Sequence, residues 1–108
     1  TTSMKEESMV SISTDTFPKK CFQDMARCFL EAPELPDYIR VSGPFFRDVD
    51  GENMQVVTIY EYDAERKRDA NEFMRRRSGT FECVDGFKCI MADSWMQPRD
   101  ALESMVQI

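Results

Sequence analysis

The sequence contains no histidine among its 108 residues. Histidine is the commonest general base, the commonest metal ligand and the usual pH switch near neutrality. The chain therefore lacks the usual residue for each of these three functions. No stretch approaches the roughly 20 consecutive apolar residues that a membrane helix needs. The net charge of -6 disfavours unspecific binding to nucleic acid or anionic lipid, because both are polyanions. We therefore expect neither nucleic acid nor a membrane as a partner.

Cysteines are few for a disulfide scaffold and widely spaced, at Cys21, Cys28, Cys83 and Cys89. Small disulfide-rich domains usually carry a higher cysteine density, so we expect free thiols in a cytoplasmic protein. The gaps of six and five residues within the two cysteine pairs are longer than those between usual zinc ligands. We therefore expect no metal and no cofactor. A zinc site and a reactive thiol are the alternative interpretations.

Length and composition indicate one domain. A chain of 108 residues is typical of a single domain and is large enough for a core, although a domain of this size gains stability from association. Residues 1–7 are polar and contain no apolar core of a signal peptide, so we expect a flexible N-terminal tail there. Residues 8–108 form the predicted domain.

The stretch at 54–62 is the centre of the predicted sheet. It is rich in β-branched and aromatic residues, which favour strands. Its apolar residues do not alternate strictly, since Val56 and Val57 are neighbours, as are Ile59 and Tyr60. A strand without strict alternation is covered on both faces, so this segment is expected inside a sheet.

Three further strands are predicted. Residues 9–14 alternate apolar and polar, which is typical of a half-buried strand. Residues 38–47 form a strand bent at Gly43-Pro44, and the turn-forming residues 48–53 close a hairpin. Residues 87–96 form the last strand, with four residues at period two: Phe87, Cys89, Met91 and Trp95.

Two helices are predicted between the strands. The first runs from about 18 to 32, with Asp15 and Thr16 as candidate N-caps and an apolar face formed by Phe22, Met25, Ala26 and Phe29. The second runs from about 64 to 78 between an Asp63 cap and Gly79 at the C′ position, with a thin apolar stripe of Ala70, Phe73 and Met74. A short helix at 99–106 follows the last strand.

The predicted order is strand, helix, strand, strand, helix, strand, which indicates an α+β, ferredoxin-like βαββαβ fold. Such a fold has a four-stranded antiparallel sheet with two helices on one face. The other face would stay uncovered although the central strand is apolar on both sides, so we expect a homodimer through the open sheet face.

Four short stretches, 35–38 (LPDY), 43–45 (GPF), 60–63 (YEYD) and 84–87 (VDGF), together with the element order, resemble the dimeric α+β barrel superfamily. The resemblance covers residues 9 to about 96. It implies ferredoxin-like subunits that pair their sheets and a pocket between sheet and helices in each subunit. The superfamily includes monooxygenases without a cofactor, lactone isomerases, ligand-sensing domains and haem-dependent enzymes. The haem branches use a histidine ligand, which this chain lacks.

Candidate ligand-binding residues are the aromatic and arginine side chains expected near that pocket: Tyr38, Arg40, Phe45, Tyr60, Tyr62, Arg77 and Trp95. Aromatic side chains would surround a planar or apolar ligand, and Arg77 or Arg40 would hold its acidic group by a bidentate contact. If Arg77 is buried it needs a carboxylate partner, and Glu61 is the nearest candidate on a strand. In the alternative interpretation, the aromatic residues form only core and dimer interface, and Arg77 is a helix-end side chain whose charged end reaches the solvent.

Three functions are compatible with these residues. The first is a dimer that binds a small apolar or aromatic acid, or that only associates with itself. The second is a cofactor-independent monooxygenase or isomerase for a small aromatic or lactone-type substrate. There Tyr60 or Tyr62 orients the substrate, Glu61 is the base if burial raises its pKa, and Trp95 walls the pocket. The third is a nucleic-acid or protein-recognition sheet, although the central strand lacks the glycines and basic residue of the common RNA-binding module.

Overall fold

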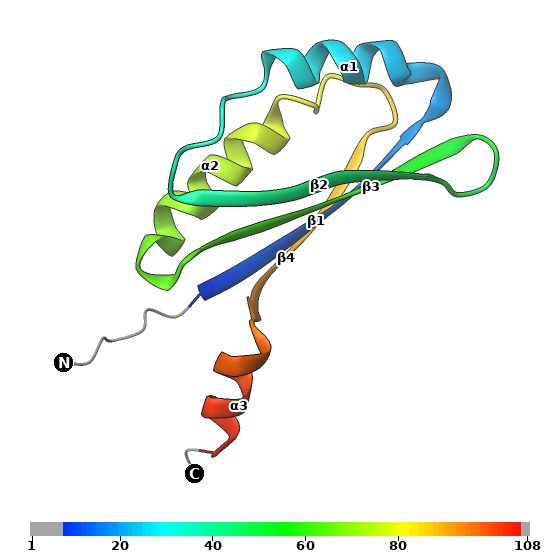
Figure 1. Ribbon diagram of the computed structural model, residues 1–108. Helices are drawn as coiled ribbons and strands as arrows, with labels where there is room; N and C mark the ends of the chain where they lie inside the picture. Colours follow the sequence, from blue (N-terminus) through cyan, green and yellow to red (C-terminus); the bar gives the residue numbers. More distant parts are fainter. Residues whose placement is uncertain (1–7, 107–108) are drawn as a thin grey trace.

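The computed structural model describes residues 8–106, which form a four-stranded antiparallel sheet and three α-helices (Figure 1). This α+β arrangement is consistent with a ferredoxin-like fold. Two 3₁₀ turns, Lys19–Cys21 and Ala64–Arg66, precede the first two α-helices. The elements follow in the order β1 (Ser8–Pro18), α1 (Phe22–Glu31), β2 (Ile39–Asp48), β3 (Asn53–Asp63), α2 (Lys67–Gly79), β4 (Lys88–Met96) and α3 (Pro98–Val106). The predicted tail at residues 1–7 lies outside the described residues.

The sheet order is β2-β3-β1-β4, so the predicted central strand is an interior strand. Along β3 every second side chain is buried: Val56, Thr58, Tyr60 and Tyr62. The residues between them are only half-buried, because within one chain the helices cover a single face of the sheet. The sequence predicts that both faces of this strand are covered. In the isolated chain this is confirmed for the face under the helices, and the opposite face is only half-buried.

The helices α1 and α2 lie on the same face of the sheet (Figure 1). The main core forms where α2 contacts β2 and β3, and its buried residues are Ile39, Tyr60, Tyr62, Ala70, Phe73 and Met74. The predicted stripe of the second helix is thus confirmed. A smaller cluster joins α1 to the segment after α2 and contains Cys21, Cys28, Phe81 and Val84.

The β4 strand contains an irregularity that the sequence pattern did not predict. Ser94 has a φ of 66°, and the register against β1 shifts so that Ala92 pairs with Ile12 while Trp95 pairs with Val10. One extra residue in a strand moves the following side chains to the opposite face. Met91 therefore faces the helices, whereas Trp95 faces the open side, and the prediction that they share a face is wrong.

Several predicted helix ends are also wrong. The β1 strand continues to Pro18, so Asp15 and Thr16 are strand residues and not caps. Gly79 belongs to α2 and has no left-handed φ, so it is not the C′ residue of a glycine cap. Asp63 precedes the turn at Ala64–Arg66 but makes no capping hydrogen bond through its side chain. The predicted hairpin turn is confirmed, because the carboxylates of Asp48 and Asp50 accept bonds from its backbone N–H groups.

The open face of the sheet carries rows of paired residues. One row is Phe45, Val57, Thr14 and Ile90; the next is Ser42, Ile59, Ile12 and Ala92; the third is Arg40, Glu61, Val10 and Trp95. Most of the apolar members are half-exposed or exposed in the isolated chain. The centre of this face is therefore an apolar patch, which is unusual for a surface that stays in water.

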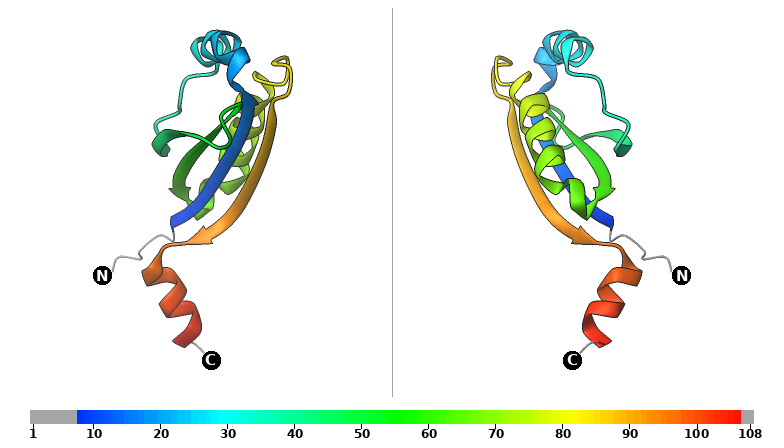
Figure 2. Two further views of the ribbon diagram at one scale, coloured as in Figure 1. Left: turned by 90° about the vertical axis from the view of Figure 1, so that its right-hand side faces the viewer. Right: turned by 90° about the vertical axis from the view of Figure 1, so that its left-hand side faces the viewer.

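The chain is more extended than its length suggests. Its radius of gyration is 16.2 Å, against about 13 Å for a compact domain of this length. The β2–β3 hairpin projects from one end of the sheet, and α3 projects beyond the end of β4 without covering the sheet (Figures 1 and 2). Exposed apolar side chains on α3 are Leu102, Met105 and Val106. Within residues 8–106 no helix is long and apolar enough to cross a membrane.

Candidate functional site

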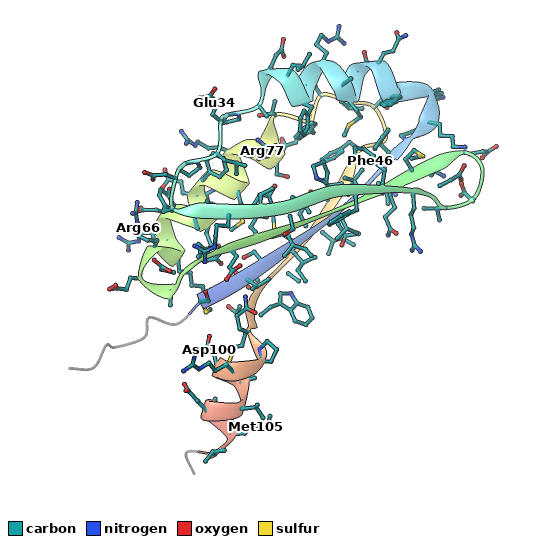
Figure 3. The ribbon with its side chains drawn as sticks, in the orientation of Figure 1. Glu34, Phe46, Arg66, Arg77, Asp100 and Met105 are labelled. Carbon is teal, nitrogen blue, oxygen red and sulfur yellow. The ribbon has the colours of Figure 1, made fainter. Side chains whose placement is uncertain are left out.

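A cavity of about 380 Å³ lies between α1 and the sheet. Its volume falls in the range of small-molecule sites. The floor consists of residues that face the helix layer from all four strands, among them Phe46, Val56, Asp15 and Met91. The end of α2 and the segment after it contribute Met74, Arg77, Ser78 and Phe81. Figure 3 shows Phe46 and Arg77 in the space between α1 and the sheet.

The roof of the cavity is the predicted apolar face of α1. Phe22, Met25, Ala26 and Phe29 all line it. Phe22 and Phe29 are 53% and 45% exposed, so this face is not packed on the sheet as a core helix would be. The helix is instead attached at its side, where Cys28 is buried against the segment after α2. An amphipathic helix held in this way leaves its apolar stripe available to a ligand.

Arg77 supplies the positive charge of the cavity wall. One guanidinium nitrogen donates a hydrogen bond of 2.9 Å to the carbonyl of Pro33, and the guanidinium carbon lies 5.4 Å from the centre of the Phe29 ring. These contacts fix the side chain without neutralising it. Among the described residues Arg77 has no ion-pair partner. Glu61 lies on the other face of the sheet, where it pairs with Arg40. The expectation that Glu61 would be its partner is therefore wrong.

Tyr60 adds a hydroxyl group to the same wall. The side chain faces the helices and is 6% exposed. Burial raises the pKa of Tyr60 above its ordinary value, and the positive charge of Arg77 partly offsets this rise. The phenol is therefore protonated at neutral pH and can donate a hydrogen bond into the cavity.

Asp15 is a cavity residue that the sequence reasoning missed. Its carboxylate accepts a hydrogen bond of 3.0 Å from the Ser13 hydroxyl. Burial raises the pKa of Asp15, and hydrogen bonds with Cys89 and Ser13 oppose part of the rise. The position of Asp15 before Pro18 favours a helix cap, although the two-residue period of Ser11, Ser13, Asp15 and Phe17 is a signal for a longer strand.

Of the predicted ligand-binding residues, Tyr60 and Arg77 line the cavity. Tyr62 is fully buried beside α2, and its hydroxyl shares a hydrogen bond of 2.7 Å with Ser11. Tyr38 lies under the Arg66 guanidinium, 3.8 Å from the ring centre. These two tyrosines are therefore structural neighbours of the core and not part of the cavity wall.

Phe45, Arg40 and Trp95 lie on the open face, outside the cavity. The prediction that Trp95 walls the pocket is wrong because of the β4 bulge. The candidate Phe45 lies on the open face, and the bend at Gly43-Pro44 directs Phe46 toward the cavity in its place. That peptide bond is cis, and the register of β2 against β3 shifts between Ser42 and Phe45.

Glu61 also lies on the open face, where it cannot reach the cavity. Its carboxylate accepts hydrogen bonds from Ser8 at 3.1 Å and Gln97 at 3.0 Å, and Arg40 lies 3.2 Å away. The Arg40 contact is the main reason that the pKa of Glu61 is lowered. A base in a closed pocket would need the opposite shift, so the structure contradicts the role predicted for Glu61.

The cysteines do not form one cluster. Cys28 and Cys83 lie together, with 3.6 Å between their sulfur atoms, whereas Cys89 contacts Ser13 on the sheet at 3.7 Å. Within the part of the chain that the structure describes, no three Cys, Asp or Glu side chains are placed to hold a metal ion.

Comparisons with known proteins add information on the fold alone. No model of a known protein family matches the chain, and no similar sequence is found among curated proteins. Among solved structures, a similar one is the de novo designed protein Foldit4, with a TM-score of 0.51 and 14% sequence identity. The match covers 85% of this chain and 100% of the designed one. Function must therefore be inferred from the cavity and the surface.

Proposed function

We propose that this chain binds a small, mainly apolar carboxylic acid in the cavity between α1 and the sheet, as a homodimer of the dimeric α+β barrel kind. The observation that carries the proposal is an apolar cavity whose wall contains an arginine without an ion-pair partner among the described residues. A cytoplasmic location belongs to the proposal and is supported by the four free cysteines.

The polar groups of the cavity favour one orientation of the ligand. The carboxylate would accept hydrogen bonds from the remaining N–H groups of Arg77, and the Tyr60 hydroxyl would donate another. Asp15 lies on the floor and repels an anion. The aromatic or aliphatic body of the ligand would therefore extend from Arg77 across Phe46 and the apolar face of α1.

Calorimetry with matched acids and amides tests this binding mode. Phenylacetate and octanoate are expected to bind, and phenylacetamide and octanamide to bind about 10- to 100-fold more weakly, because a hydrogen bond to a charged group contributes about 1.5–3 kcal/mol. Arg77→Gln should remove the preference for the acid. Arg66→Gln is the matched control, since Arg66 stacks on Tyr38 outside the cavity. Equal affinity for acid and amide, or no binding of any compound, would refute the proposal.

The open sheet face supports the homodimer. Four strands of 9–11 residues present a face of roughly 19 by 33 Å, about 600 Å². A stable interface buries about 800 Å² on each partner, so this face supplies most of the area that a second copy needs. Its centre is apolar and charged side chains lie toward its ends, for example Arg40 at one end and Arg47 at the other. Two copies related by a two-fold axis would bury the apolar rows against each other.

Isomerisation is a second candidate function, favoured by the position of Asp15 in the cavity. An Asp15 carboxylate could take a proton from the carbon next to a carbonyl of a lactone-type substrate and return it to another carbon. Arg77 and Tyr60 would stabilise the enolate oxygen between these steps. In deuterated water, the wild-type chain should then catalyse exchange of that C–H, and Asp15→Asn should not. If the wild-type chain does not catalyse this hydrogen–deuterium exchange, the second candidate function is wrong.

A further inference from the structure

Two thiols from distant parts of the chain meet at the side of the cavity roof. Cys28 lies on α1 and Cys83 in the turn after α2, 55 positions apart in sequence. Their sulfur atoms are 3.6 Å apart. Cys28 is 4% exposed, whereas Cys83 is exposed to solvent. One thiol is therefore accessible to a reagent and the other is placed directly behind it.

We propose that Cys28 and Cys83 are a redox pair that a hydroperoxide converts into an intramolecular disulfide. In the first step the Cys83 sulfur attacks the peroxide, the O–O bond breaks, and Cys83 sulfenic acid and water (or an alcohol) form. In the second step the Cys28 sulfur attacks the Cys83 sulfur, the S–O bond breaks, and water leaves with the thiol proton. Two thiols are oxidised and one peroxide is reduced, so the electrons balance.

The environment of the two thiols determines this order. Burial raises the pKa of Cys28, and its contact with Cys83 raises it further, so Cys28 is a poor first nucleophile. Cys83 is accessible, and besides its contact with Cys28 its thiol donates a weak hydrogen bond of 3.8 Å to the carbonyl of Thr80 in its own turn. Short-range hydrogen bonds hold this turn, for example from Val84 to Phe81. The turn can therefore move by the roughly 1.5 Å that separates the present sulfur contact from a disulfide of about 2.05 Å.

The disulfide would act on the cavity, a consequence that rests on the proposed function. The α1 helix carries the roof residues, and Phe81, in the same turn as Cys83, also lines the cavity. The small cluster around Cys28 attaches this helix to the rest of the fold. A covalent bond there would tie the roof to the wall and slow its opening. We expect slower ligand exchange in the oxidised chain, with the cavity itself unchanged.

Mass spectrometry of the full chain tests the pair without any ligand. The reduced chain is treated with one equivalent of hydrogen peroxide. The expected product has lost two hydrogen atoms, and its protease digest links the peptides of Cys28 and Cys83. Cys83→Ser and Cys28→Ala should abolish this product. Cys21→Ser and Cys89→Ser are the matched controls and should keep it, because the Cys21 thiol donates to the carbonyl of Asp85 and the Cys89 sulfur contacts the Ser13 hydroxyl. Cys83 is exposed, so its variant will fold even if a change at buried Cys28 does not.

Hydrogen exchange then reports on the roof independently of binding. Amides of α1 should exchange at least 10-fold more slowly in the oxidised chain than in the reduced chain, and those of α3 should not change. An unchanged mass, a link through Cys21 or Cys89, or a disulfide between two chains would overturn the proposed pair. A correct link with unchanged α1 exchange would overturn its effect on the roof. Failure of the acid-binding proposal alters neither result.

Discussion

Replacement of Trp95 by alanine is expected to dissociate the proposed homodimer. Trp95 lies in the third row of the open face, beside Val10, and is 50% exposed in the isolated chain. A tryptophan can bury 150–250 Å², so about 100 Å² is left for a partner to cover. At about 25 cal/mol per Å², this area contributes about 2.5 kcal/mol per protomer. Two-fold symmetry doubles the effect to about 5 kcal/mol, or between 10³- and 10⁴-fold in the dissociation constant.

Sedimentation velocity over a concentration series measures this change. The wild-type chain should sediment with twice its mass of 12.6 kDa, and the Trp95→Ala variant as a single chain at the same micromolar concentration. Val49→Ala is the control, because Val49 is 52% exposed but lies in the hairpin turn outside the strand rows of the open face. A wild-type chain that stays monomeric, or a Trp95→Ala variant that dimerises as tightly as wild type, would refute the reasoning.

Three further predictions concern stability and are measured by urea unfolding. Gly86→Ala should destabilise the fold by about 1–3 kcal/mol, because the φ of Gly86 is +81° and a Cβ atom there would lie 2.8 Å from Pro18. Gly79→Ala should stabilise it by about 0.5–1 kcal/mol, because Gly79 lies in a helix and a Cβ atom there would meet no other atom within 4 Å. Asp15→Asn should stabilise the fold at pH 7. Burial raises the pKa of Asp15 in the folded chain, so the ionised carboxylate destabilises the fold at neutral pH. Below about pH 3.8 the carboxyl is protonated in both the folded and the unfolded chain, and the gain should vanish. Glu61→Gln should destabilise the fold at pH 7, because the contact with Arg40 lowers the pKa of Glu61 and so stabilises the folded chain with an ionised carboxylate. This loss of stability should vanish as the pH falls below about 4.5 and Glu61 becomes protonated in the folded chain as well. A difference in stability between variant and wild type that is the same at neutral and at acid pH would contradict the prediction for that carboxyl group. Equal effects of Gly86→Ala and Gly79→Ala would contradict the glycine prediction.

The sequence predicted the main elements of the fold because apolar period and turn residues are local signals. The interior position of β3, the hairpin at 48–53 and the apolar stripe of α2 all follow from such signals. The open apolar face was also anticipated, because two helices cannot cover both sides of one sheet. These features need only the spacing of residues along the chain.

The errors arise where one residue changes the face of a strand. The bulge at Ser94 directs Trp95 to the open face, and the bend at Gly43-Pro44 directs Phe45 to the open face and Phe46 to the cavity. Neither shift has a periodic signal before the partner strand is known. Asp15 was missed for a different reason, since Asp before Pro18 is also a good pattern for a helix start. Arg77 and Tyr60 were predicted, yet their joint position required the fold.

The most direct test of the central claim, that the cavity is a binding site for an apolar acid, is ¹³C-methyl NMR of the methionines. Met25, Met74 and Met91 line the cavity, whereas Met105 lies exposed on α3. During titration with phenylacetate the three cavity methyl signals should shift together and saturate, and the Met105 signal should not change. Arg77→Gln should remove these shifts at the same concentrations. Shifts confined to Met105, or no saturable shift of the cavity methyl groups, would contradict the account.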